Sequence, residues 1–330
     1  MTDKNDLTKE IQERVRVAAD AGTPLRIRGG NTKAFYGRET TGDALDVSGL
    51  RGIVSYEPTE LVITARAGTP LTEVEATLRE RGQMLAFEPP HFGEGATLGG
   101  AVASGLSGPA RPYAGSVRDF VLGVVCINGQ SEQLSFGGQV MKNVAGYDVS
   151  RLMVGAMGTL GVLLEISLKV LPRPSNEATL ALQLDAQSAI SKMNTWAAQP
   201  LPISASCYDG ELLRVRLSGS ESGVRSARER IGGDEVADGG EYWTKLRDHQ
   251  LAFFDDKVPL WRVSVPAATP APVDDGNCLL DWGGAQRWLI SDSSANKIRQ
   301  QAAAVNGHAL LFRGGDREGE VFHPLAPTIA

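Results

Sequence analysis

The spacing of hydrophobic residues predicts a helix near the start of the chain. Leu7, Ile11 and Val15 recur every four residues, and Gly22 ends the pattern. Residues near 6–21 are therefore expected to form an amphipathic helix with one buried face. Shorter runs of hydrophobic and β-branched residues follow this helix and have the character of strands. These runs are residues 25–28, 44–47, 53–56 and 61–65.

A second helix and a hairpin are expected before residue 140. Thr69 precedes a helical pattern that ends at Gly82, so Thr69 is expected to cap that helix. Residues 120–127 and 130–136 have strand character and are separated only by Asn128-Gly129. Because asparagine and glycine both tolerate positive φ, this pair predicts a two-residue hairpin turn.

The pattern changes near residue 174. Residues 162–171 alternate so that one face of a strand is fully apolar, and Pro172-Arg173-Pro174 then interrupts the chain. Beyond it, strand and helix patterns follow in an order that suits an antiparallel sheet with helices on one face. They comprise residues 178–184, 186–198, 203–208, 212–217 and 220–231. We therefore expect two domains, residues 1–174 and 175–330.

Composition excludes several classes of protein. The 330 residues include 33 Lys+Arg and 39 Asp+Glu, a net charge of −6, which gives no basic face for nucleic acid. Charges interrupt every long apolar stretch and the N-terminus lacks a signal-peptide pattern, so a soluble, cytoplasmic protein is expected. Cys126, Cys207 and Cys278 are far apart, which predicts neither a zinc site nor a disulfide framework.

Several common cofactor and catalytic motifs are absent from the sequence. No lysine follows a glycine, so there is no P-loop, and no G-x-G-x-x-G indicates a nicotinamide-binding fold. The four histidines form no H-E-x-x-H motif and no cluster with aspartate. The sequence thus gives no positive signal for a metal site or a hydrolytic triad.

Glycine is the unusual component, and it is clustered. Three of the clusters, at residues 28–32, 95–105 and 155–162, have the character of loops that approach an anion, because glycines let successive N–H groups point at it. Tight turns of an α+β domain are the alternative for each loop taken alone. Three in order, with residues 142–148 before the last, favour a nucleotide-containing cofactor.

These segments resemble a known family. The strand followed by RGGNT, the ATLGGAVASG loop and the KNVAGYD…GTLGVLLEISLKVLP segment are similar to the FAD-binding domain of the vanillyl-alcohol oxidase/p-cresol methylhydroxylase (PCMH) superfamily. The last segment, with the C-terminal RGGDREGEVFHPL, narrows the resemblance to the smaller FAD-binding subunits of bacterial glycolate oxidase (glycolate dehydrogenase).

The resemblance implies an α+β fold class. A PCMH-type FAD-binding domain of two α+β subdomains would be followed by an antiparallel-sheet cap domain. Packing of the C-terminal end of the cap back on the FAD domain is left open.

The resemblance also implies which residues hold FAD. Backbone N–H groups of one loop would bind the pyrophosphate: Arg28, Gly29, Gly30, Asn31 and Thr32. Pyrophosphate and ribityl would lie along Thr97, Leu98, Gly99, Gly100, Ser104 and Gly105. Main chain at Gly161 and Val162 would meet the adenine or the flavin, and Lys142, Asn143 and Tyr147 are candidates near the flavin or residues of a solvated turn.

Two departures from the superfamily bear on the chemistry. Members with covalent FAD place a histidine where this chain has Asn31-Thr32, so non-covalent FAD is expected. His91 remains a remote alternative, and a surface turn is the simpler interpretation. Relatives carry a segment of the H-x-G-D-G-N-x-H type, which implies a bound metal ion and a general base. In this chain the corresponding position is occupied by residues 313–318. No metal is therefore expected, nor oxidation of the hydroxy acid by this chain alone.

The expected function is that of an FAD-dependent oxidoreductase subunit that takes part in oxidation of glycolate to glyoxylate. The resemblance implies a larger FAD-containing subunit and an iron–sulfur subunit as partners, since three scattered cysteines cannot supply four thiolates to a cluster. Contact with the inner membrane would come only through those partners. The alternatives are a stand-alone 2-hydroxy-acid (D-lactate-type) dehydrogenase and a non-catalytic assembly subunit with a flavin fold.

Overall fold

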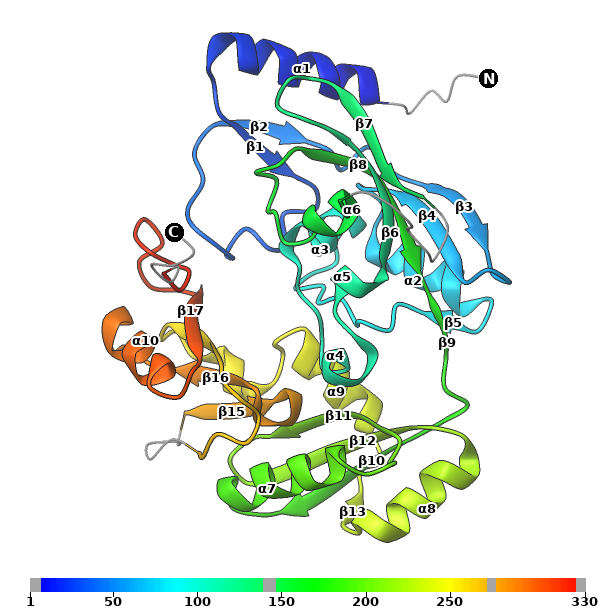
Figure 1. Cartoon of the computed structure of the whole chain (residues 1–330), viewed down its shortest axis with the longest axis vertical. Helices are drawn as coiled ribbons and strands as arrows, with labels where there is room; N and C mark the ends of the chain where they lie inside the picture. Colours follow the sequence, from blue (N-terminus) through cyan, green and yellow to red (C-terminus); the bar gives the residue numbers. More distant parts are fainter. Residues whose placement is uncertain (1–6, 139–146, 272–276, 325–330) are drawn as a thin grey trace. The chain divides into compact units, whose positions relative to one another are not determined.

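The computed structural model describes residues 7–138, 147–271 and 277–324 (Figure 1). The chain forms two compact units. The first unit comprises residues 1–34, 40–108 and 115–173, and the second comprises residues 35–39, 109–114 and 174–330. Two short segments of the N-terminal half thus belong to the second unit.

The first unit begins with α1 (Thr8–Ala21), close to the predicted helix. Gly22 ends it with a φ of 65°, a left-handed conformation that suits glycine. The buried face of α1, which includes Ile11 and Val15, packs in one cluster with Val162 and Leu164. β1 (Leu25–Arg28) then pairs in parallel with β2 (Asp43–Asp46).

A five-stranded antiparallel sheet forms the centre of this unit, with β8 in the middle. The order is β3 (Ile53–Glu57), β4 (Val62–Arg66), β8 (Val162–Lys169), β6 (Val121–Ile127) and β7 (Gln133–Gly137). The remaining elements are short: α2 (Leu71–Arg79), α3 (Leu98–Ser104), α5 (Val117–Phe120), α6 (Val149–Leu152) and the pair β5 (Gln83–Met84) and β9 (Leu171–Pro172).

Two local predictions in this unit are wrong. Thr69 does not cap α2, because its hydroxyl instead accepts from the Gly52 N–H at 2.9 Å, and Pro70 stands at the cap position. The turn between β6 and β7 is also longer than two residues. The Asn128 side chain accepts from the N–H groups of Gln130 and Glu132, both at 2.9 Å, and this side-chain cap stabilises a wider loop.

The second unit contains an eight-stranded antiparallel sheet. The order is β13 (Asp234–Glu235), β10 (Asn176–Gln183), β12 (Leu212–Gly219), β11 (Ile203–Tyr208), β15 (Cys278–Asp281), β16 (Gln286–Ile290), β14 (Leu260–Ser264) and β17 (His308–Arg313). Its helices are α4 (Arg111–Ala114), α7 (Ala186–Ala197), α8 (Glu221–Ile231), α9 (Gly239–Arg247), α10 (Ala295–Ala303) and the 3₁₀ turns η1 (Ala252–Asp255) and η2 (Trp282–Gly284).

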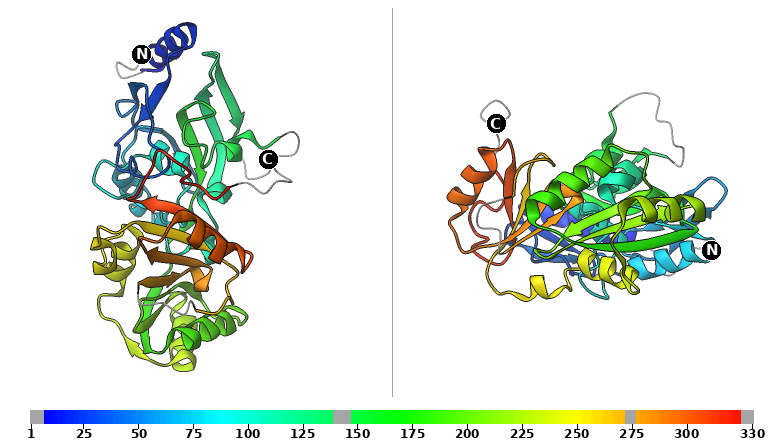
Figure 2. Two further views of the ribbon diagram at one scale, coloured as in Figure 1. Left: turned by 90° about the vertical axis from the view of Figure 1, so that its left-hand side faces the viewer. Right: turned by 90° about the horizontal axis from the view of Figure 1, so that it is seen from below.

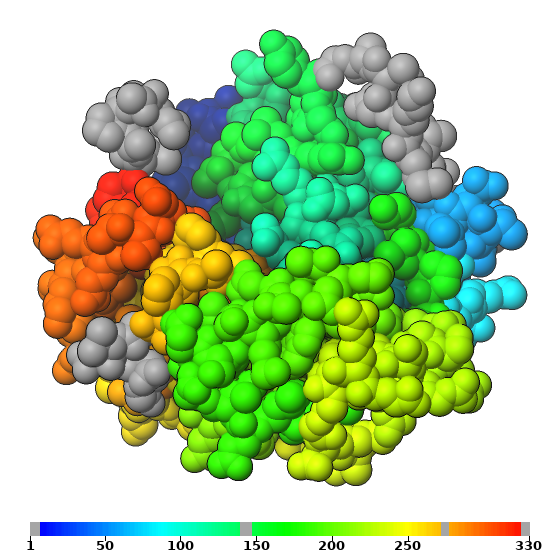
Figure 3. Space-filling view, turned by 60° about the horizontal axis from the view of Figure 1, so that its bottom comes forward, coloured from blue at the N-terminus to red at the C-terminus, as the bar shows by residue number. Residues whose placement is uncertain are grey.

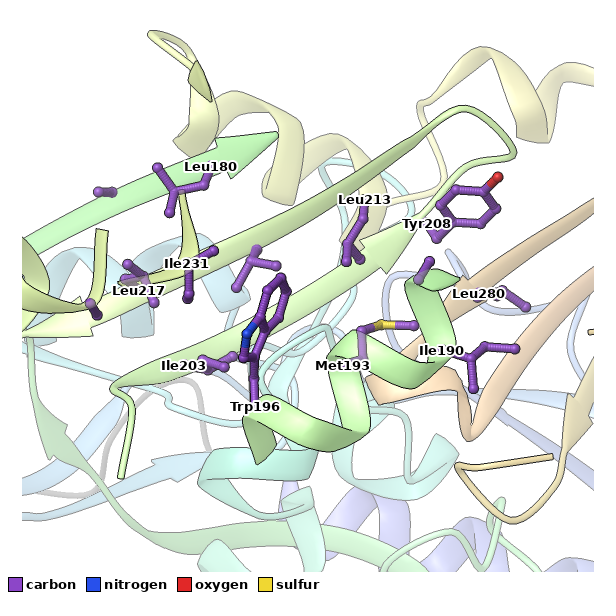
Figure 4. Packing of buried hydrophobic residues seen from close by; sticks show 14 of the residues in the cluster. Leu180, Ile190, Met193, Trp196, Ile203, Tyr208, Leu213, Leu217, Ile231 and Leu280 are labelled. Atoms are coloured by element: carbon purple, nitrogen blue, oxygen red, sulfur yellow. The ribbon is translucent and has the colours of Figure 1, made fainter. Parts of the chain in front are cut away.

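Helices α7 and α8 cover one face of this sheet and share its main core, as expected from the sequence (Figure 2). Met193 and Trp196 of α7 point at Leu213 and Leu217 of β12 (Figure 4). The same two helices form part of the surface of this unit in Figure 3, where α7 is bright green and α8 yellow-green. The predicted antiparallel sheet is confirmed.

The burial of Leu164 in the middle strand of the first unit predicts a large stability difference between two nearby leucines. Leu164 is 2% exposed and Leu160 is 46% exposed. Leu164→Ala leaves a cavity, so the free energy of unfolding should fall by about 2–5 kcal/mol. Leu160→Ala, the matched control, should change it by no more than about 0.5 kcal/mol. Equal effects in denaturant titrations would contradict this packing.

Candidate functional site

The loop of residues 28–32, called the first loop, follows β1 directly. Arg28 is its first residue, and its guanidinium lies 3.3 Å from Asp46 Oδ2 of β2. Both side chains are nearly half exposed, so this ion pair contributes little to stability. Asn31 has a φ of 59°, which turns the backbone sharply after the strand.

The first loop offers a row of unused backbone donors. Within the described part of the chain, the N–H groups of Gly29, Gly30, Asn31 and Thr32 donate to no acceptor of the protein. Successive N–H groups with a left-handed residue among them form a concave nest that suits an anion. The sequence analysis proposed backbone binding of a pyrophosphate at these residues, and this geometry fits that proposal.

The loop of residues 95–105, called the second loop, lies against the first. A Cβ built on Gly30 would be 1.4 Å from the Gly95 carbonyl oxygen, and one on Gly29 would be 2.5 Å from Thr97 Oγ1. Only glycine permits this approach. The glycines of the first loop are therefore required for packing between two segments of the protein, whether or not a ligand is present.

The start of α3, within the second loop, uses its own N–H groups internally. The N–H of Leu98 donates to the Thr69 carbonyl at 2.9 Å, and that of Gly99 donates to the Ala67 carbonyl at 2.7 Å. The N–H of Gly100 donates to Thr97 Oγ1 at 3.2 Å, which is the helix cap. These three groups are thus not free for a phosphate, unlike those of the first loop.

Gly100 and Ser104 differ in how much of each residue is available to a ligand. A Cβ on Gly100 would lie 3.2 Å from Thr97 Oγ1, which is a tight contact, and no other atom would lie within 4 Å of it. The Ser104 hydroxyl donates to the Ala101 carbonyl at 3.0 Å. Gly105 ends α3 with a φ of 67°. This segment therefore presents backbone to a ligand, rather than free N–H donors.

The loop of residues 155–161, called the third loop, lies along α3. The N–H of Gly155 donates to the Val102 carbonyl at 3.0 Å, and the N–H of Met157 donates to the Ala103 carbonyl at 2.9 Å. Gly161 has a φ of 145°, and a Cβ there would be 2.5 Å from the Ile127 carbonyl oxygen. Val162 begins β8 with its side chain 3% exposed. The three loops are therefore brought together around α3.

Of the remaining predicted residues, only Tyr147 is described. Lys142 and Asn143 lie outside the described residues. Tyr147 is 97% exposed, which fits the solvated-turn interpretation. Its role beside a flavin stays a prediction.

Lys33, which the sequence analysis did not name, and His91, which it considered only as a remote alternative for covalent attachment, lie next to each other beside the first loop. Lys33 Nζ lies 3.5 Å from Thr32 Oγ1, 3.3 Å from the His91 carbonyl oxygen and 5.6 Å from the centre of the Phe92 ring. His91 Nε2 lies 3.1 Å from Glu75 Oε1, and its side chain is 12% exposed, so the surface-turn interpretation is wrong. The position of Lys33 could have identified it from the sequence, because it places a positive charge directly after RGGNT.

The residues present fit the phosphates of FAD. A pyrophosphate carries two negative charges and needs several donors. Four free N–H groups, with the side chains of Arg28 and Lys33 next to them, supply donors and positive charge in one place. The open backbone at Gly100 can accommodate a flat group. This combination is typical of a protein that binds an FAD-type dinucleotide.

Comparison with known proteins supports that class. Residues 6–149 match the family described as FAD binding domain. A structure of alkyldihydroxyacetonephosphate synthase superposes with a TM-score of 0.67 at 15% identity, covering 91% of this chain and 69% of that chain. This likeness shows the fold, and the predicted α+β, PCMH-type fold class is confirmed.

The family is shown by a sequence relative. The glycolate oxidase subunit GlcE of Escherichia coli (strain K12) is 54% identical over 311 residues, 94% of this chain and 88% of that protein. The chain belongs to the GlcE family of FAD-binding proteins. A D-lactate dehydrogenase of Anaerostipes hadrus is 28% identical, covering 53% of this chain and 37% of that protein. The glycolate oxidase subunit GlcD of Bacillus subtilis (strain 168) is 27% identical, covering 52% and 37%.

These comparisons confirm the resemblance that the glycine loops indicated, including the FAD-binding domain. Among the described helices, none combines the length and hydrophobicity needed to cross a bilayer.

Two adjacent glycines of α3 should respond differently to the same substitution. In Gly99→Ala the methyl would lie 2.8 Å from Ala67 Cβ and 2.9 Å from its carbonyl oxygen, so stability should fall by about 1–3 kcal/mol. In Gly100→Ala the methyl would meet only Thr97 Oγ1, at 3.2 Å, and the helix gains propensity, so the FAD-free chain should lose less stability than Gly99→Ala does. We expect it nevertheless to retain less FAD, because the methyl fills the open space.

Denaturant titration of the FAD-free chains and FAD titration of each variant measure the two effects. A loss of stability in Gly100→Ala as large as that in Gly99→Ala, or full stability in Gly99→Ala, would contradict the packing of α3 on Ala67.

Proposed function

We propose that this chain is the FAD-holding subunit of a glycolate oxidase complex and takes part in oxidation of glycolate to glyoxylate. FAD supplies the redox chemistry, because its flavin accepts the two electrons that leave the substrate. The observation that carries the proposal is the row of four free N–H groups in the first loop, beside Arg28 and Lys33, in a chain of the GlcE family.

The first loop would hold the cofactor mainly through its backbone. The positive charge of Arg28 is partly offset by Asp46 and both side chains reach solvent, so Arg28 is expected to contribute less than the N–H groups. Lys33 is held between the Thr32 hydroxyl and the His91 carbonyl, which positions its ammonium group at the end of the loop. This arrangement would fix the pyrophosphate without any covalent bond.

The proposed complex contains a larger FAD-containing subunit and an iron–sulfur subunit. The cysteines of this chain support assigning the iron–sulfur cluster to a partner subunit. The chain has only three cysteines, and all of them, Cys126, Cys207 and Cys278, are buried. An iron–sulfur cluster generally takes four cysteine ligands. Any contact with the inner membrane is proposed to come through these partners.

The segment that corresponds to the histidine-rich cap of relatives supports the need for a partner. It begins at Arg313, whose Nη2 donates to the Phe254 carbonyl at 2.7 Å, and continues through two glycines with positive φ. An arginine tied to a backbone carbonyl is no general base at neutral pH. Removal of the substrate proton is therefore assigned to the larger subunit.

The first test concerns attachment of the flavin. Asn31 and Thr32 offer no nucleophile for covalent linkage, and His91 Nε2 is occupied by Glu75. After acid precipitation of the purified yellow chain, the flavin absorbance should therefore appear in the supernatant. Flavin in the pellet would mean covalent attachment, with His91→Ala as the variant that locates it. A colourless chain that takes up no added FAD would favour the assembly role instead.

The second test concerns catalytic sufficiency. The FAD-loaded chain alone should not reduce an artificial electron acceptor with glycolate or D-lactate above background, whereas the chain reassembled with its partner subunits should. The lone larger subunit is the matched control. Turnover by this chain alone would favour a stand-alone 2-hydroxy-acid dehydrogenase.

A further inference from the structure

The turn of residues 91–95, called the supporting turn, carries the end of the first loop. The His91 carbonyl oxygen lies 3.3 Å from Lys33 Nζ and accepts a hydrogen bond from it. A Cβ on Gly93 would lie 3.2 Å from Thr32 Cγ2, so the turn also packs directly against the loop. The position of the supporting turn therefore determines where the ammonium group of Lys33 stands.

The backbone of the supporting turn is in a conformation that needs to be held. Phe92 has a φ of 53° and Gly93 a φ of 142°. A left-handed conformation is unfavourable for a residue with a Cβ, and it persists only where surrounding contacts fix it. Pro89 and Pro90, just before the turn, have no N–H groups with which the main chain could be tied down. An anchor through a side chain is therefore required.

The His91 side chain supplies this anchor. Its Nε2 lies 3.1 Å from Oε1 of Glu75 on α2, and the two side chains are 12% and 23% exposed. An ionised carboxylate only accepts, so the shared proton belongs to Nε2. A hydrogen bond to a charged group is stronger than one between neutral groups. α2 is a firm base for it, because three of its side chains are fully buried: Leu71, Val74 and Leu78.

The charge of Glu75 and its hydrogen bond act on anion binding in opposite directions. A negative charge close to a phosphate site repels the ligand, so the charge alone would lower the affinity for FAD. The hydrogen bond would raise that affinity, because a lysine that is already held loses less conformational freedom when a phosphate binds. Experiment can therefore separate the two effects by their sign.

We propose that Glu75 is a positioning residue for FAD. Through the His91 ring it holds the supporting turn, and through that turn it holds the Lys33 ammonium beside the pyrophosphate. Lys33 Nζ also lies 3.5 Å from Thr32 Oγ1, which keeps the ammonium at the end of the first loop. The inference rests on the proposed binding of FAD at that loop, whereas the contacts from α2 to Lys33 are a feature of the chain itself.

The test is calorimetric titration of the flavin-free full chain with FAD. Glu75→Ala should weaken FAD binding by about threefold to tenfold, because the supporting turn loses its anchor. Glu75→Gln keeps an oxygen that accepts from His91 Nε2, so its FAD affinity should equal or exceed that of the unmodified chain. Glu75→Asp keeps the charge but is one methylene shorter, so it should weaken binding as Glu75→Ala does. This variant keeps the test decisive if Glu75→Ala does not fold.

Two controls separate positioning from a general effect on the fold. Glu73 is an exposed carboxylate on the same helix, and Glu73→Ala should leave FAD affinity unchanged. Lys33→Met should weaken binding by about tenfold, because a charge-assisted contact is lost. Adding Glu75→Ala to Lys33→Met should then weaken it no further, because Glu75 acts through the ammonium that is already gone.

Three results would overturn the inference. They are FAD binding in Glu75→Asp and any folded Glu75→Ala that is unchanged or tighter, weakening in Glu75→Gln as large as in Glu75→Asp, and independent, additive effects of the Glu75 and Lys33 substitutions. The proposed function fails in other ways. A full chain that takes up no FAD would overturn both, whereas turnover of glycolate by the lone FAD-loaded chain would overturn only the assignment as a dependent subunit.

Discussion

The close approach of two backbone segments in the first unit is the constraint on which the cofactor site depends. Gly30 lies so near the Gly95 carbonyl that no side chain fits between them. This contact holds the first loop in a conformation in which its own N–H groups have no internal acceptor. The third loop and Ala67 then fix α3 from two further sides. Unpaired donors cost free energy in the folded chain, and under the proposed role a bound anion would offset that cost.

The sequence could predict the elements whose signals are local. The helical spacing before Gly22 and the alternation along β8 produced the expected helix and strand, because each depends on residues close in the chain. Where a distant partner competes, local reasoning failed. Thr69 had the chemistry of a helix cap, but Gly52 offers its hydroxyl a pair of backbone groups. Asn128 likewise widened a turn through its side chain.

The sequence indicated where the candidate site lies, but it did not indicate which backbone N–H groups of the site are free. The RGGNT signature identified the loop with free donors, yet the same reasoning treated the ATLGG glycines as equivalent, although their N–H groups are used within the protein. Which glycine serves the fold and which serves a ligand depends on what lies across from it, and one sequence does not contain that information.

The path of the chain between the two units bears on how this protein can be divided. Phe35 and Tyr36 come three and four residues after Thr32, yet their rings pack 5.5 Å and 5.2 Å from Phe312, and Arg317 Nε donates to the Gly37 carbonyl at 2.8 Å. Arg111 similarly covers Trp282. A fragment cut after residue 174 would carry these side chains without their partners. Neither half is therefore a self-contained module, and a gene fusion or truncation at that point would expose aromatic surface on both products.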